Sequence, residues 1–257
     1  MLPDYITKAV PNPVSQRAPW YTNTAPSYAG VFLWIVFYKE IAIGTLDRAG
    51  VGLSLLALVA AGLLAYALYR APAMLGMQTG YPLYVVGSST FGTKGGYLMP
   101  GLLMGLLQVG WLSVNIFVST NFILSGLGSK AGAGSLPFIV IAILWGYGLT
   151  YIGVKGIQYV GKFSLYLSGI TLLMILFVFA RTAGGIGQFV PSDPNPYLGF
   201  MLLIQVVIGF HATAGAAGAD FGMNSRDARD VRWGGMVGIS LAVLIAGGLP
   251  LLSVAGA

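Results

Sequence analysis

Hydrophobic residues in this chain are gathered into long runs, which short polar or glycine-rich segments separate. A helix needs roughly 20 apolar residues to cross the hydrocarbon core of a bilayer. Seven stretches qualify, at residues 28–46, 50–69, 98–124, 136–154, 157–181, 197–217 and 233–257. Lipid offers the backbone no hydrogen-bonding partners, and the alternating pattern of barrel strands is missing from the sequence. The runs therefore predict an all-α membrane protein with about seven transmembrane helices.

The composition agrees with a membrane protein and excludes several other classes. Only 8% of the 257 residues are charged and 56% are hydrophobic, whereas a soluble domain is typically about 25% charged. A soluble enzyme and an ordinary nucleic-acid-binding domain are therefore excluded, and the lipid bilayer is the expected surrounding. The sequence has no cysteine, which excludes disulfides and thiol-ligated metals.

The distribution of basic residues predicts the orientation in a cell membrane. If the N-terminus is cytoplasmic, nine basic residues fall in inner segments and three in outer ones, as the positive-inside rule requires. The inner residues are Lys8, Arg17, Arg70, Lys94, Lys155, Lys162, Arg226, Arg229 and Arg232, and the outer ones are Arg48, Lys130 and Arg181. The net charge of +6 is thus explained by topology. Residues 1–27 contain charges and prolines but no apolar run, so they are expected to form a cytoplasmic tail and not a signal peptide.

Polar side chains inside an apolar run are costly and therefore informative. The third run contains Gln108, Trp111, Asn115 and Ser119 at spacings of three and four, which places them on one helical face. A tryptophan flanked by amides suits a flat ligand, because the ring stacks and the amides bind its edge. The same stripe could instead hold neighbouring helices together.

Three further groups carry charge or titratable chemistry. Lys39 and Glu40 lie past the middle of the first run, where they either form a coupling-ion or proton site or extend to the outer interface. His211 is followed by small residues up to Asp220, a stretch that could unwind or be approached closely. The charged stretch 225–232 is interpreted as a solvated run whose aspartates favour a helix N-terminus.

Residues 70–97, between the second and third runs, are either an interfacial segment or a loop.

Several motifs together resemble the nucleobase–cation symporters, the permeases for cytosine, purines, uracil, thiamine, allantoin and hydantoins. The resemblance extends from about residue 17 to 250. The motifs that carry it are Arg17-Ala18-Pro19-Trp20-Tyr21 with Asn23 and Ala25-Pro26, Phe91-Gly92 with Lys94-Gly95-Gly96 and Pro100, Trp111 with Asn115, Phe210-His211-Ala212-Thr213, and Asp220-Phe221. His211 stands where the family usually has a tryptophan, and Met223 stands where it has an arginine.

The resemblance implies a LeuT-type fold of two inverted five-helix repeats, with the first helix of each broken near the midplane. It implies that the substrate, a nucleobase-like planar heterocycle, stacks between aromatic residues of the third and sixth spans and is driven by Na⁺ or H⁺. The implied substrate-binding residues are Trp111, Asn115, Gln108, His211 and Phe210, and Lys39 and Glu40 are the candidates for ion coupling. No metal or other cofactor is expected.

On this interpretation residues 28–181 form the first repeat, 182–196 an outer loop and 197–257 the first two helices of the second repeat. The chain is then expected to be the N-terminal part of a permease. A seven-span receptor or sensor that binds a small ligand is the alternative. An enzyme is not expected, because the sequence lacks a Gly-x-Ser-x-Gly elbow, a His-Glu-x-x-His motif and paired aspartates within the runs.

Overall fold

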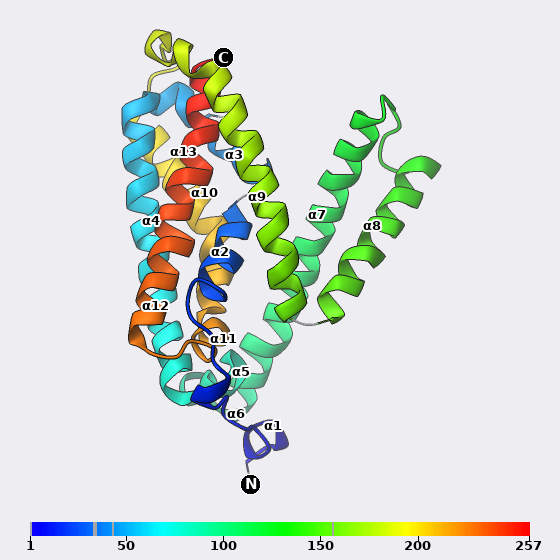
Figure 1. The fold of residues 1–257 in the computed structure, drawn as a ribbon, viewed down its shortest axis with the longest axis vertical. Helices are drawn as coiled ribbons and strands as arrows, with labels where there is room; N and C mark the ends of the chain where they lie inside the picture. The colour runs from blue at the N-terminus through cyan, green and yellow to red at the C-terminus, as the bar shows by residue number, and fades with distance from the viewer. Residues whose placement is uncertain (1, 33–34, 43, 156) are drawn as a thin grey trace.

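The computed structural model describes residues 2–32, 35–42, 44–155 and 157–257, and these ranges fold into helices without a β-strand (Figure 1). The helices, in chain order, are α1 (Asp4–Thr7), η1 (Val14–Gln16), α2 (Thr24–Phe32), α3 (Ile35–Ala42), α4 (Leu46–Thr79), α5 (Leu83–Val86), α6 (Ser88–Gly96), η2 (Tyr97–Leu103), α7 (Met104–Gly126), α8 (Leu136–Val154), α9 (Ile157–Thr182), η3 (Ala183–Gln188), α10 (Pro196–Ala216), α11 (Gly218–Gly222), α12 (Ala228–Gly235), η4 (Met236–Leu241) and α13 (Ala242–Ala255). The predicted all-α class is confirmed.

Within the described residues, five helical stretches are long and apolar enough to cross a membrane. They are Leu46–Thr79, Ser88–Gly126, Leu136–Val154, Tyr166–Gln188 and Ala228–Ala255. Each overlaps one of the seven predicted runs. The run at 197–217 corresponds to α10, whose apolar part Pro196–Ala212 is shorter. The run at 28–46 includes residues 33, 34 and 43, so the predicted break in the first helix lies outside the described residues. The number seven and the inverted repeats remain predictions.

The second and last runs are longer helices than the sequence predicted. Helix α4 does not end at residue 69 but continues through Pro72 to Thr79, where Gly80 adopts a left-handed φ of 72° and ends it. The interpretation of 70–97 as a loop is therefore wrong, because α4, α5 and α6 make most of it helical. The last stretch begins at Ala228, where the side chain of Asp227 accepts a hydrogen bond of 2.8 Å from the Asp230 N–H.

Helix α4 packs along one face against α10, α11 and the last helical stretch. One stripe of α4 is fully buried, and it consists of Ala57, Leu58, Ala61, Ala65, Tyr69 and Ala73. These residues pack with Leu203 and Val207 of α10 and with Ile239 and Val243 of the last helical stretch. Most members of the stripe are alanines, since small side chains allow the close helix–helix approach that drives association in a bilayer.

Helix α4 approaches the small-residue stretch after His211 closely, which is one of the two possibilities that the sequence left open. A Cβ added at Gly222 would overlap the backbone of Ala73, and one at Gly76 would overlap the backbone of Ala219. These contacts join α11 directly to the end of α4. The continuation of α4 beyond residue 69 is thereby explained, because its last turns have a packing partner.

Different segments of the chain meet at the two ends of the bundle. At one end, Arg17 donates hydrogen bonds to the carbonyl oxygens of Asn12, Met77 and Ser225, at 2.7–3.3 Å. At the other end, Arg48 contacts Asp193 at 3.3 Å. Segments that the charge rule assigned to one side of the membrane thus meet at one end of the structure.

Helices α7 and α8 form a hairpin that stands apart from the bundle (Figure 1). Many of its large apolar side chains are exposed, for example Leu106, Phe117, Ile143 and Leu144. An exposed apolar surface of this extent is expected to face lipid or further protein.

Candidate functional site

The predicted polar stripe contacts the bundle through the ring of Trp111. The ring centroids of Trp111 on α7 and Phe210 on α10 lie 5.5 Å apart, and the rings are inclined at 39°. This separation is within the range of favourable aromatic pairs. Two of the predicted substrate-binding residues, 99 positions apart in the sequence, are thus brought together.

The amides of the stripe lie beside this aromatic pair. Asn115 is half-buried, and its Nδ2 donates a hydrogen bond of 3.0 Å to the carbonyl oxygen of Trp111, one turn earlier on the same helix. Gln108 is exposed, and its Nε2 lies 3.9 Å from the sulfur of Met104. Ser119 is half-buried. The shared face that the spacing predicted is therefore partly accessible around Trp111.

His211 faces a different part of the molecule from Phe210. It is fully buried, and its ring centroid lies 5.8 Å from that of Tyr28. Tyr28 in turn contacts Phe221 at 4.4 Å and Tyr69 at 5.2 Å between ring centroids. Adjacent residues on a helix point about 100° apart, so Phe210 is directed to Trp111 while His211 belongs to an aromatic cluster in the core.

The two candidates for ion coupling are only partly described. Glu40, in α3, is exposed. The side chain of Lys39 lies outside the described part of the structure. Within the described residues, no group of three or more His, Asp or Glu side chains is arranged to hold a metal ion.

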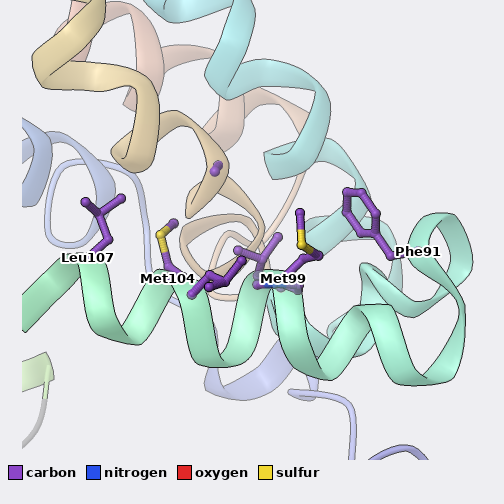
Figure 2. A pocket seen from close by; sticks show the side chains of 8 residues that line it. Phe91, Met99, Met104 and Leu107 are labelled. Carbon is purple, nitrogen blue, oxygen red and sulfur yellow. The ribbon is translucent and has the colours of Figure 1, made fainter.

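An apolar cavity of about 310 Å³ is lined, along the stretch that leads into α7, by residues up to Leu107, one turn before Trp111. Figure 2 shows Phe91, Met99, Met104 and Leu107 around it. Its walls come from α5, α6, η2, the start of α7 and the end of α10. The lining residues are Leu83, Phe91, Met99, Pro100, Leu103, Met104, Leu107 and Ala216. The sequence alone did not predict this cavity, because Leu83 and Phe91 belong to the segment 70–97, for which it predicted a loop or an interfacial stretch.

Asp220, a residue of α11, forms a hydrogen bond with the cavity wall. Its Oδ1 accepts a hydrogen bond of 2.8 Å from the N–H of Leu83, the first residue of α5. Burial raises the pKa of the Asp220 carboxyl, and the Leu83 N–H offsets part of this rise because it stabilises the charged form.

Comparison with known proteins gives a partial match. No family model matches the chain. The cytosine permeases of Escherichia coli strains K12 and O157:H7 are each 26% identical to it over 179 residues, which are 67% of this chain. The matched region covers 37% of each permease, so the chain spans little more than a third of the length of these relatives.

The similarity to permeases and the five long apolar helices together indicate a multi-pass membrane protein. The relation to a permease family that the motifs suggested is supported at this level of identity. The receptor alternative gains no support from these relatives.

Proposed function

We propose that this protein is a secondary transporter of a planar, nucleobase-like heterocycle, driven by a gradient of Na⁺ or H⁺. The observation that carries the proposal is the contact between Trp111 and Phe210, with Asn115 one turn from the indole. The similarity to cytosine permeases supports the same class of solute. A LeuT-type arrangement of inverted repeats is part of the proposal.

The side chains around Trp111 supply the interactions that a flat heterocycle needs. The indole offers a face for stacking, and it is half-buried, so part of it is accessible. The Asn115 amide uses one N–H for the Trp111 carbonyl, which orients its carbonyl oxygen and second N–H as an acceptor and a donor. Gln108, one turn earlier, adds a second amide for the edge of the ring.

His211 and Phe210 have separate roles in this proposal. Phe210 closes the aromatic side of the site, since it contacts Trp111 directly. His211 fixes the position of α10 through its packing in the core beside Tyr28. Glu40 is the proposed carboxylate for ion coupling, and Lys39 is its neighbour in the sequence.

Uptake into proteoliposomes tests this function. Vesicles containing the full-length permease, of which we propose that this chain is the N-terminal part, are given radiolabelled cytosine, uracil or hydantoin under an inward Na⁺ gradient, an inward H⁺ gradient or no gradient. We expect saturable uptake of at least one heterocycle under one gradient, and slower uptake by Glu40→Gln. Binding of a heterocycle without gradient-driven uptake would instead favour the receptor alternative.

A further inference from the structure

A basic and aromatic surface lies where the last helical stretch begins, away from the Trp111 site. Arg229, Arg232 and Trp233 are exposed on α12, and Arg226, just before α12, is exposed as well. The opposite side of α12, with Asp230 and Val231, is buried. The helix therefore presents a face of arginines and tryptophan outward, at the level where an apolar span begins.

Aromatic residues from the N-terminal segment extend this surface. The rings of Trp20 and Trp233 are stacked, with centroids 6.5 Å apart and an interplanar angle of 30°. Tyr21 packs edge-on against Trp20 at 5.7 Å and is 60% exposed. Tryptophan and tyrosine are enriched at the headgroup level of membranes, because their rings are apolar and their N–H or O–H is polar.

Asp230 holds the surface together. It is only 2% exposed, and its carboxylate accepts hydrogen bonds from Arg226 at 2.6 and 3.1 Å and from the Trp20 N–H at 3.2 Å. The interpretation of 225–232 as a solvated charge run holds for Arg226, Asp227, Arg229 and Arg232, which are exposed, and fails for Asp230, which is buried and hydrogen-bonded. Trp20 is fixed beside Trp233 by the same carboxylate.

The charges on this surface are not balanced. Arg226 is paired with Asp230, and the Asp227 side chain caps α12. Within the part of the chain that the structure describes, neither Arg229 nor Arg232 forms an ion pair. Two guanidinium groups thus remain available beside an aromatic cluster, and a guanidinium binds phosphate oxygens with two parallel hydrogen bonds.

We propose that the surface formed by Tyr21, Trp20, Trp233, Arg229 and Arg232 binds the headgroup of an anionic phospholipid. The phosphodiester is bound by Arg229 and Arg232, and the rings of Trp233, Trp20 and Tyr21 pack against the glycerol backbone and the first methylenes of the acyl chains. Charge complementarity selects an anionic lipid over a zwitterionic one. Attraction of this kind gives roughly a 5-fold gain in affinity for each arginine near the membrane surface.

Binding of short-chain lipids to the purified full chain in neutral detergent tests the proposal. Dihexanoyl-phosphatidylglycerol, dihexanoyl-phosphatidylcholine and inorganic phosphate are titrated separately, and tryptophan fluorescence and thermal stability are recorded. We expect saturable binding of phosphatidylglycerol that is weakened by salt, and weaker binding of the other two. The double variant Arg229→Gln/Arg232→Gln should lose about 25-fold in affinity for phosphatidylglycerol.

The matched control is the double variant Lys130→Gln/Arg181→Gln. It removes the same charge from two exposed residues, one in the loop between α7 and α8 and one in the last turn of α9, and it should bind phosphatidylglycerol as the wild type does. Equal affinity of wild type and Arg229→Gln/Arg232→Gln for phosphatidylglycerol would overturn the proposal. So would equal affinity of the wild type for phosphatidylcholine, for inorganic phosphate, or an equal loss in the control variant.

Discussion

The carboxylate of Asp220 accepts a hydrogen bond of 2.8 Å from the backbone N–H of Leu83. This bond joins α11 to the first residue of α5, from which the chain continues through α6 and η2 into α7. Phe210 precedes Asp220 in the chain, on α10, and Trp111 follows Leu83, on α7. Asp220 is therefore a positioning residue for the aromatic pair, on which it acts through the backbone of α5.

Two substitutions of Asp220 distinguish the effect of its charge on stability from the effect of its hydrogen bond. Asp220→Asn keeps an oxygen that can accept from Leu83, so we expect near-normal stability. Asp220→Ala leaves the Leu83 N–H without its acceptor and should destabilise the fold by about 1–3 kcal/mol. Thermal unfolding of the two variants in detergent measures the difference. Equal destabilisation by Asn and by Ala would show that the charge matters and the hydrogen bond does not.

The raised pKa of the Asp220 carboxyl predicts a pH dependence of stability. A carboxyl whose pKa is higher in the folded than in the unfolded state favours folding most below its unfolded pKa of about 4. Its contribution falls as pH rises through the folded pKa. The melting temperature of the wild type, relative to Asp220→Asn, should therefore decrease from pH 4 upward and then level off. A relative melting temperature that rises over this interval contradicts the assignment.

Close packing of α11 on α4 predicts which glycines cannot carry a methyl group. An added Cβ at Gly222 overlaps the backbone of Ala73, so Gly222→Ala should cost about 1–3 kcal/mol or more through forced separation of the helices. Gly105→Ala is the control, since its added Cβ meets none of the described atoms within 4 Å. Removing a helical glycine there should be neutral or stabilising by up to ~1 kcal/mol. Similar melting temperatures for both variants would contradict the packing described.

The sequence predicted helices well where local signals mark their ends. The run 136–154 matches α8, because Ser135 caps the helix through the Phe138 N–H and Pro137 stands in its first turn. The end of α4 was missed, because Arg70 and Pro72 are local signals for a boundary while the packing of Ala73 and Gly76 on α11 is a tertiary effect.

The candidate site was predictable only within one helix. Spacing alone placed Gln108, Trp111 and Asn115 on one face of α7. It could not show that Phe210 contacts Trp111 while His211 packs beside Tyr28, because this depends on how α10 is rotated against α4. The burial of Asp230 was missed for the same reason, since its partner Trp20 is 210 residues away in the sequence.

Segments predicted to lie on the same side of the membrane meet at the same end of the bundle, so the topology can be tested with one exposed residue on each side. Ser89 and Ser192 are exposed at segments assigned to opposite sides of the membrane. Since the chain has no native cysteine, single-cysteine variants at these positions report their side directly. We expect an impermeant maleimide to label position 192 in intact cells and position 89 only after permeabilisation. Labelling of position 89 in intact cells would reverse the proposed orientation.

Equilibrium binding to the purified protein tests whether Trp111 and Asn115 bind a planar heterocycle. Each has a matched control. Trp145 is a half-exposed tryptophan on the neighbouring helix α8, and Asn121 on α7 donates to the Phe117 carbonyl oxygen at 2.8 Å as Asn115 does to that of Trp111. Folding is compared by melting temperature, so that a loss of affinity is separated from a loss of structure.

Titration with cytosine, uracil and hydantoin should identify a heterocycle that binds the wild type saturably. Trp111→Ala should then weaken its binding by roughly 1–3 kcal/mol, the cost of losing one stacked aromatic face, and Asn115→Ala should lose about 1 kcal/mol or more for an unmade hydrogen bond. Trp145→Ala and Asn121→Ala should retain wild-type affinity. Unchanged affinity in both Trp111→Ala and Asn115→Ala would contradict the account and leave the stripe with a packing role.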